Sequence, residues 1–369
     1  MIGFYPLKPA ARVVARTVAK ATAKATAFEK YLGLLKKNGG VIMLRVALMS
    51  KWHVHAEGYA ELLRSFSDAE ITCVWDEEPE RGREWAKSLN VDFEEDMDKI
   101  LAREDVDGIL VCSPTSMHAE IMKKAAKAGK HIFTEKAMAL TKKECEEITA
   151  EVKKAGVKFG ISHPARTTSS NLYVKSVIDA GLIGKVTLLR IRNGHDGALN
   201  NWLPEYWYDE SKAGGGAMMD LGCHPMYLAS WILGKPVRIS SMFSYVTNRT
   251  VEDNSVCTIE FENNAVAIVE TSLVTYKTPS MVEVYGTEGT IVICDNDIRM
   301  TSKKMDEEFK GWVTPAKLPE ALPHSLRQWV DGVLYNKPIL FDTEAGTKLT
   351  ELLEAAYIAH KEKREVSFN

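Results

Sequence analysis

The amino-acid sequence predicts an α/β Rossmann domain, a doubly wound parallel sheet, followed by an α+β domain with an open, mostly antiparallel sheet. Over residues 43–163, short strands that are apolar throughout alternate with helices, the pattern of a parallel sheet covered on both faces. Beyond Pro164, strands with alternating apolar and polar residues follow one another without helices between them, which is typical of antiparallel sheets. At 369 residues the chain is long enough for two such cores.

In the first domain, strands and helices alternate. The predicted strands cover residues 44–49, 70–76, a short stretch near Val91, 108–114, 131–136 and 158–163. The predicted helices cover 54–66, 79–90, 97–104, 118–129 and 142–156. Pro79 stands in the first turn of its helix, and Gly129 and Gly156 end theirs, which are the positions that proline and glycine favour.

The second domain, residues 164–369, begins with a predicted helix at 169–181 and a strand at 186–194. A loop rich in Trp, Tyr and Pro leads to a Gly-rich turn and a helix at 218–233. Strands are predicted at 238–246, 255–263, 265–274, 280–287 and 289–295, with turns at 260–264 and 287–289. An amphipathic helix at 344–361 is expected to pack back across the structure.

The composition narrows the classes of function. Hydrophobic residues make up 45% and charged residues 26%, as in ordinary globular proteins, and no apolar run reaches the roughly 20 residues that span a bilayer. The net charge of −3 gives no support to nucleic-acid binding. The six cysteines lie far apart without a CxxC pair, which predicts free thiols and no zinc site. We therefore expect a cytoplasmic protein whose partner is a small molecule, with no metal, membrane or nucleic acid.

Residues 1–42 form a basic leader with eight Lys or Arg residues and one acidic residue, Glu29, so the remaining chain carries a charge of −10. Three interpretations are open: a transit peptide, a helix that packs on the body, and an over-extended start ahead of a working protein that begins at Met43. Gly39 and Gly40 favour the third, because codons for Gly-Gly can contain a ribosome-binding sequence just upstream of Met43. We hypothesise that the start is over-extended.

The loop after the first strand is the expected place for a dinucleotide phosphate, where a Rossmann fold normally carries G-x-G-x-x-G. Here Ser50, Trp52 and His55 stand where the three glycines would be. Ser50 still offers a hydroxyl and an amide, whereas Trp52 must change how the chain approaches the phosphates. We name Ser50, Trp52, His53 and Val54 as cofactor contacts; the alternative for Trp52 and His53 is loop packing.

Asp76 closes the second strand, 21 residues after His55, which suits a carboxylate that accepts hydrogen bonds from the adenosine ribose. A carboxylate there would repel a 2′-phosphate, so NAD is favoured over NADP. Arg81 and Arg83 are nearby cations that would soften this preference. The alternative interpretation of Asp76 is a helix N-cap.

The third long strand ends at Ser113, Pro114 and Thr115, where proline forces a turn at the carboxyl end of the strand. Ligands of open α/β sheets bind at these ends, so we expect all three to contact the cofactor. His118 is a further cofactor candidate, with helix-start packing as its alternative.

Two clusters predict the chemistry. Glu135 and Lys136 end an apolar strand, where a lysine faces the crevice and desolvation can lower its pKa. Asp220 and His224 follow three glycines at 214–216 and stand four residues apart, on one face of a helix. An isolated Asp-x-x-x-His pair more often serves as a helix cap or salt bridge, so the second cluster by itself is weak evidence for a functional site.

Taken together, these residues resemble the Gfo/Idh/MocA family, that of glucose–fructose oxidoreductase and inositol dehydrogenase. The resemblance covers residues 44–368 and is carried by VDGILVCSPTSMHAEIMKKAAKAGKHIFTEKAMAL, GLIGKV, GGGAMMDLGCHPMYLASWILGKP, EDNSVCTIEFEN and VEVYGTEGTI, in this order. It implies an NAD(P)-dependent oxidoreductase that acts on a secondary hydroxyl of a sugar, inositol or glycoside, and an assembly into homo-oligomers. In some members the cofactor stays bound through both half-reactions.

The family's Glu-Lys-Pro motif matches Glu135 and Lys136, with Ala137 in place of proline. The resemblance implies that Lys136 lies near the nicotinamide and the substrate hydroxyl and stabilises developing oxygen charge. It implies that His224 is the general base for alcohol oxidation, with Asp220 orienting the substrate or the imidazole. The absence of the proline alters the expected backbone there.

The substrate contacts that we expect are His163, Arg166, Asn193 and His195, with Asp196 beside them. Each has a structural role as its alternative. The aromatic residues Trp202, Tyr206, Trp207 and Tyr208 form either a wall that stacks on a sugar ring or a packing contact between domains.

The leading function is dehydrogenation of a ring hydroxyl, with 3-oxidation of a glycoside as a narrower hypothesis. Two alternatives stay open at this point: an NAD-dependent glycosidase that works through transient oxidation, and a non-catalytic NAD-binding sensor that has lost its phosphate loop. The joint presence of Lys136, Asp220 and His224 argues against the sensor, which has no need of all three.

Overall fold

A computed structural model describes residues 42–305 and 311–368 of the chain. The leader at residues 1–42, about which three interpretations were open, lies outside the described residues except for Ile42. Everything below concerns the body that begins at Leu44.

The first sheet has six parallel strands in the order β3-β2-β1-β4-β5-β6, the order typical of dinucleotide-binding folds. The strands are β1 (Leu44–Met49), β2 (Ala69–Trp75), β3 (Asp92–Phe93), β4 (Gly108–Val111), β5 (His131–Thr134) and β6 (Phe159–Ile161). The helices between them are α2 (Ala56–Arg64), α3 (Pro79–Leu89), α4 (Met97–Ala102), α5 (Thr115–Lys127) and α6 (Lys142–Ala155). The predicted Rossmann fold is confirmed.

Local sequence explains where these helices begin and end. Pro79 opens α3, and the side chain of Thr141 caps α6 in a capping box with Glu144. Gly156 ends α6 in the left-handed conformation. Helix α5 begins at Thr115, a turn earlier than the sequence predicted, because Pro114 occupies the N-cap directly after the strand.

The second sheet has eight strands in the order β13-β12-β11-β7-β10-β9-β8-β14. Within the described part of this sheet, the β7–β10 pair is parallel and the other pairs are antiparallel, so the prediction of a mostly antiparallel sheet is confirmed. The strands are β7 (Val186–Gly194), β8 (Pro236–Ser244), β9 (Asn254–Phe261), β10 (Val266–Ser272), β11 (Met281–Gly286), β12 (Gly289–Cys294), β13 (Asp297–Ser302) and β14 (Val366–Ser367).

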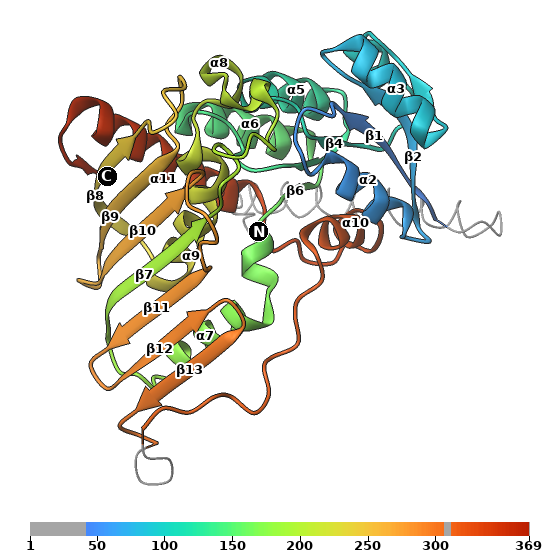
Figure 1. The fold of residues 1–369 in the computed structure, drawn as a ribbon. Helices are drawn as coiled ribbons and strands as arrows, with labels where there is room; N and C mark the ends of the chain where they lie inside the picture. Colours follow the sequence, from blue (N-terminus) through green and yellow to red (C-terminus); the bar gives the residue numbers. More distant parts are fainter. Residues whose placement is uncertain (1–41, 306–310, 369) are drawn as a thin grey trace, which may run out of the picture. The chain divides into compact units, whose positions relative to one another are not determined.

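The second half also contains helical segments that lie on or between the two sheets (Figure 1). They are η1 (Pro164–Thr167), α7 (Ser169–Asp179), η2 (Glu205–Tyr208), α8 (Glu210–Ala213), η3 (Met218–Gly222), α9 (Cys223–Leu233), α10 (Ser325–Tyr335) and α11 (Thr343–Glu362). Helix α11 contacts both α6 of the first half and β8 of the second, as expected for a helix that packs back. None of the described helices is long and apolar enough to cross a membrane.

Strand β13 and helix α10 were not predicted. Helix α10 carries the fully buried Trp329, whose indole lies over the α-carbons of Gly108 on β4 and Gly160 on β6. The division of the chain after residue 163 therefore separates α10 in sequence from the sheet that it covers. Figure 1 shows α10 and α2 on one side of this sheet and α5 and α6 on the other.

Candidate functional site

The turn after β1 keeps the backbone of a nucleotide loop without its glycines. Ser50 adopts a φ of 74°, a conformation that glycine normally supplies, and its amide donates to the carbonyl oxygen of Trp75 at 2.6 Å. The Ser50 hydroxyl accepts from the amide of Trp52 at 3.0 Å. The hydroxyl thereby stabilises a turn in which the G-x-G-x-x-G motif would have its first glycine.

Trp52 packs against the second half of the chain. Its indole is buried and stacks on Trp207 of η2, with ring centroids 4.7 Å apart and an interplanar angle of 12°. Tyr206 of the same segment donates its hydroxyl proton to the carbonyl oxygen of Trp52 at 3.2 Å. Two of the predicted wall residues therefore pack between the domains, whereas Trp202 is half exposed beside His195.

The space beside this stack is small. Trp52, His53, Thr115, Lys136, Trp207, Ala213, Gly215, Met219 and Asp220 line a cavity of about 20 Å³. Ligand pockets usually measure about 300–1,000 Å³. A nicotinamide ring can therefore enter only if side chains that line the cavity move, and Trp207 is one of these side chains.

Asp76 is fully buried and is already engaged within the protein. Its carboxylate accepts from the amides of Lys51 and Glu78 and from the Arg81 guanidinium, with the shortest contact at 2.6 Å. Arg81 also contacts Glu77. Because Arg81 neutralises Asp76, the electrostatic argument for NAD over NADP is weaker than the sequence implied.

The turn after β4 lies next to the same cavity. Ser113 is buried, Pro114 caps α5, and Thr115 lines the cavity. His118 is buried with Nδ1 and Nε2 at 2.9 and 3.0 Å from the carbonyl oxygens of Ala137 and Ser113, which favours its helix-packing alternative. Val54 is 43% exposed and does not line the cavity.

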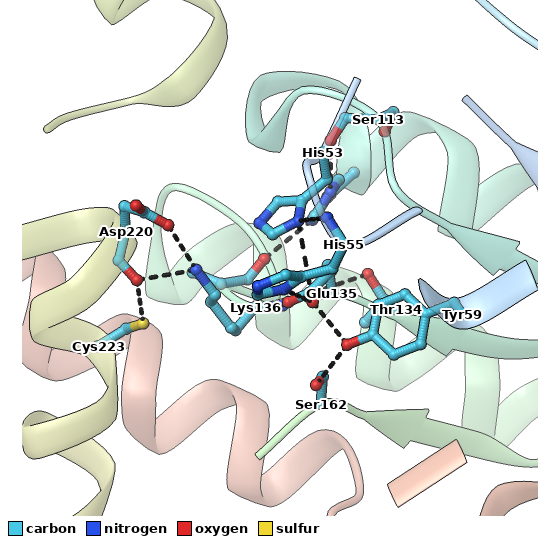
Figure 2. Close-up of polar contacts among 12 residues, drawn as sticks. His53, His55, Tyr59, Ser113, Thr134, Glu135, Lys136, Ser162, Asp220 and Cys223 are labelled. Atoms are coloured by element: carbon cyan, nitrogen blue, oxygen red, sulfur yellow. Dashed lines mark hydrogen bonds and ion pairs between the residues drawn. The ribbon is translucent and has the colours of Figure 1, made fainter. Parts of the chain in front are cut away.

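Glu135 lies at the centre of a buried hydrogen-bond network (Figure 2). Its Oε1 accepts from Tyr59 Oη at 2.5 Å and lies 2.8 Å from His55 Nδ1. Tyr59 also bonds to Ser162 Oγ on the far side. Burial acts to raise the pKa of Glu135, but the imidazoles of His53 and His55 and the Lys136 ammonium outweigh it, so that pKa lies well below its usual value.

The same network brings together possible metal ligands that are scattered in the sequence. His53, His55 and Glu135 each offer an atom within 4.8 Å of the other two. Spacing along the chain gave no sign of this cluster. Burial lowers the pKa of His53 to about 3, so its imidazole is neutral at neutral pH.

Lys136 joins the two halves of the chain. It follows β5, and its Nζ donates to both Oδ1 and the carbonyl oxygen of Asp220 on η3, each at 2.8 Å (Figure 2). Burial opposes the charged form of Lys136, yet the Asp220 carboxylate holds its pKa above the ordinary value. Lys136 is therefore an ammonium ion here, contrary to the lowered pKa that the sequence implied. Its peptide bond to Ala137 is cis.

Asp220 carries the matching negative charge. Its side chain is 16% exposed, and although burial acts in the opposite direction, Lys136 lowers the pKa of this carboxyl group from 3.8 to about 2. The Sγ of Cys223 donates to the carbonyl oxygen of Asp220 at 2.9 Å, which fixes the backbone at this point.

His224 stands at the start of α9, just after the π-helical turn η3, a kind of irregularity that is frequent at functional sites. Its Nδ1 lies 2.9 Å from Tyr227 Oη, which also accepts from the amide of Ala165. Burial and the Lys136 charge lower the pKa of His224 to about 3. The imidazole is therefore neutral at neutral pH, with a weaker basicity than an ordinary histidine.

Glu252, which sequence reasoning missed, holds the Gly-rich turn in place. Its buried carboxylate accepts from the amides of Gly216 and Met218 and from Tyr357 Oη. A Cβ on Gly216 would come within 1.9 Å of the carbonyl oxygen of Glu252, so glycine is required there. The acid falls within the segment EDNSVCTIEFEN, which was recognised only as part of the family pattern.

The four predicted substrate residues do not lie together. His195 is half-buried, and the Asp220 charge acts on its pKa, although burial is the larger effect and lowers it. Asn193 lies on β7 opposite Thr271. His163 and Arg166 line a separate cavity with Tyr227, and Lys136 is not among the residues that line it.

The residues at the sheet edge fit a dinucleotide in their chemistry. The Nε1 of Trp52 is a buried donor without a hydrogen-bond partner in the described part of the chain, and the buried Nη1 of Arg81 has an ion-pair contact with Glu78 at 3.4 Å but no hydrogen bond. Arg81 Nη2 lies 3.4 Å from Ser50 Oγ, so these donors surround the turn where a diphosphate binds in this fold. These donors suit a dinucleotide, but the cavity of about 20 Å³ beside them is too small to hold one, so we describe the groove as closed.

The chain has a six-stranded Rossmann sheet, and Lys136 at its carboxyl edge pairs with Asp220 of the antiparallel-sheet domain, which also carries His224. This arrangement is that of an NAD-binding oxidoreductase. Residues 53–163 match the oxidoreductase family with an NAD-binding Rossmann fold, and residues 171–292 match the GFO/IDH/MocA C-terminal domain. The chain belongs to the Gfo/Idh/MocA family, and NAD is its cofactor, as predicted.

Among its relatives, the chain is 31% identical over 247 residues to the uncharacterized oxidoreductase YrbE of Bacillus subtilis, covering 65% of this chain and 70% of that one. It is 26% identical over 321 residues to myo-inositol 2-dehydrogenase of Thermotoga maritima, covering 84% and 94%. The fold resembles levoglucosan dehydrogenase in complex with NADH and levoglucosan, with a TM-score of 0.77, 21% identity and coverage of 88% and 99%.

Proposed function

We propose that this protein oxidises a ring hydroxyl of a sugar, inositol or glycoside, or reduces the corresponding ketone, with Lys136, Asp220 and His224 as the catalytic residues. The observation that carries the proposal is the 2.8 Å contact between Lys136, which follows β5 of the first sheet, and Asp220 on η3 in the second half of the chain. The names of relatives that act on inositols support the substrate class.

Lys136 is suited to stabilise an alkoxide. Two of its three N–H groups are directed to Asp220, and the third remains for a substrate oxygen. Because the pKa of Lys136 is raised, the group is a fixed ammonium ion that stabilises negative charge on oxygen without giving up its own proton. A nicotinamide held at this edge of the sheet would supply the hydride chemistry.

His224 is the proton acceptor. With the hydrogen on Nδ1 donated to Tyr227 Oη, its Nε2 carries a free lone pair that takes the substrate hydroxyl proton. Tyr227 is then a positioning residue that fixes the tautomer and the ring orientation. The lowered pKa of His224 makes it a weak base, so proton removal depends on the charge stabilisation that Lys136 provides.

The experiment that tests this proposal begins with the dinucleotide released from the denatured protein, identified by chromatography. A panel of inositols, free sugars and glycosides is then screened for reduced nicotinamide, with Lys136→Met and His224→Gln as inactive variants and Lys142→Met as a surface control. A glucoside deuterated at C3 tests the narrower 3-oxidation, through a primary isotope effect and a product three mass units lighter than the labelled glucoside.

Three outcomes would oppose the proposal. Release of the free aglycone and the free sugar would identify a glycosidase that works through transient oxidation. Binding of NAD without turnover on any substrate would identify a sensor. Full activity of Lys136→Met would remove the basis of the mechanism.

We also propose that the protein forms homo-oligomers in the cytoplasm. Met242 on β8 is 76% exposed and pairs across the sheet with Val256 on β9, which is 40% exposed. Exposed apolar pairs on an open sheet favour a protein–protein contact. All six cysteines lie in the described part and none is in a disulfide, which favours a reducing compartment. Light scattering and cell fractionation test the two parts.

A further inference from the structure

A second, larger cavity lies away from the Lys136–Asp220 pair. It measures about 520 Å³ and is formed by η1, the end of α9 and the first turns of α11. The side chains that line it include His163, Arg166, Tyr227, Trp231, Lys348 and Leu349. This volume lies within the range of about 300–1,000 Å³ that small-molecule sites occupy.

His163 is the first unusual feature of this cavity. Its ring is fully buried, and neither Nδ1 nor Nε2 has a hydrogen-bond partner in the described part of the chain. It stacks on Tyr227, with ring centroids 4.2 Å apart and an interplanar angle of 17°. A buried polar ring without partners costs free energy unless a ligand or water satisfies it.

Arg166 is the second unusual feature. Its guanidinium lies over the rings of Trp231 and Phe341, 5.2 and 5.0 Å from their centroids, and its Nε is buried without a partner. Among the described residues no carboxylate forms an ion pair with it, whereas the lining residues Lys235, Lys348 and Glu351 all have charged partners. A half-buried, uncompensated arginine is suited to bind a carboxylate or a phosphate.

We infer that this cavity binds a small organic anion, whose carboxylate or phosphate pairs with Arg166 and accepts a hydrogen bond from His163. Trp231 and Leu349 provide an apolar surface for the body of the ligand.

The cavity is separated from the proposed catalytic centre by one side chain. Tyr227 presents its ring to His163 and its hydroxyl to Nδ1 of His224. A ligand that reorients His163 would therefore act on the residue that positions His224. Binding itself does not depend on hydride transfer, so it is testable whichever reaction the chain performs.

The test is calorimetric titration of the full chain with inorganic phosphate, D-glucuronate and, as a neutral probe, D-glucose. We expect saturable binding of at least one anion and none of glucose in this cavity. Arg166→Gln removes the charge, Ala345→Trp fills the cavity from α11 without changing charge, and Arg190→Gln is a matched control on β7 that keeps the cavity intact.

Both cavity variants should weaken anion binding about tenfold or more, and the control should leave it unchanged. Melting temperatures without ligand show whether each variant folds, and if Arg166→Gln does not, Ala345→Trp decides. The inference is overturned if neither anion binds saturably, if the folded cavity variants bind as the parent does, or if Arg190→Gln weakens binding equally. Phosphate binding without glucuronate binding assigns a phosphate ligand, and the reverse assigns a carboxylate.

Discussion

Replacing Asp220 by asparagine is the sharpest test of the buried ion pair. The pKa of Asp220 falls from 3.8 to about 2 in the folded protein, which corresponds to about 2 kcal/mol of stability at neutral pH. Asp220→Asn also leaves the Lys136 ammonium buried without its counter-charge, although the carbonyl oxygen at position 220 still accepts a hydrogen bond. Breaking a buried pair in this way costs about 3–5 kcal/mol. We therefore expect a loss of about 2–5 kcal/mol.

The assay is urea unfolding, followed by fluorescence, of the parent, Asp220→Asn and the double variant Lys136→Met/Asp220→Leu. The double variant removes both charges and should recover most of the stability, because apolar pairs replace buried ion pairs at little cost. Asp297→Asn is the matched control: its partner Arg299 is exposed, so the expected change is below about 1 kcal/mol.

The pH dependence of stability provides a second test of the ion pair. A depressed carboxyl pKa contributes stability that is fully present above the unfolded value of 3.8 and is lost as pH falls through about 2. The stability gap between the parent and Asp220→Asn should therefore be constant near neutrality and shrink below about pH 4. A single variant as stable as the parent, or a double variant as unstable as the single, would refute the reasoning.

Three further predictions concern other parts of the chain. Burial lowers the pKa of His131 to about 4, so between about pH 6.5 and 4 the unfolded chain binds a proton that the folded chain does not. His131→Gln should therefore reduce the slope of the unfolding free energy against pH in this range by up to about 1.4 kcal/mol per pH unit. Trp207→Ala should strengthen NAD binding about two- to tenfold in a fluorescence titration, since the stack on Trp52 competes with the cofactor; weaker binding would contradict the closed groove. Glu252→Gln should cost about 1–3 kcal/mol in thermal unfolding and lower turnover, because it places a donor against the amides that hold the Gly-rich turn, whereas exposed Glu262→Gln should change neither.

The sequence predicted the first sheet almost element by element. Strand β4 is fully apolar, and β1 and β5 are largely buried with few polar residues, so the local sequence pattern was sufficient to predict them. Helix α10 was missed even though Trp329 is fully buried, because the sheet that it covers is more than 160 residues earlier in the chain. The three proposed catalytic residues stood out as two sequence clusters, and their roles came from the family resemblance. Their geometry was not derivable from spacing along the chain.

Contacts between distant residues account for the rest of what sequence reasoning missed. Trp52 was recognised as an anomaly in the phosphate loop, yet its stacking partner Trp207 stands in a loop that carries three other aromatic residues. Similarly, no spacing rule relates His53 and His55 to Glu135. Serine at position 50 shows why a glycine motif search fails here: the backbone conformation is retained at a residue that the motif excludes.

The ion pair between Lys136 and Asp220 on η3 also holds the two halves of the chain together. Its ammonium group follows β5 of the first sheet and its carboxylate partner lies on η3 in the second half of the chain, so any hinge motion that parts these two lobes must break this bond. Since the side chain of Lys136 is only 2% exposed, dissolved salt hardly screens its attraction to Asp220. High ionic strength will therefore not weaken this ion pair as it weakens surface ion pairs. Neutralising either charge is the direct way to let the lobes swing apart.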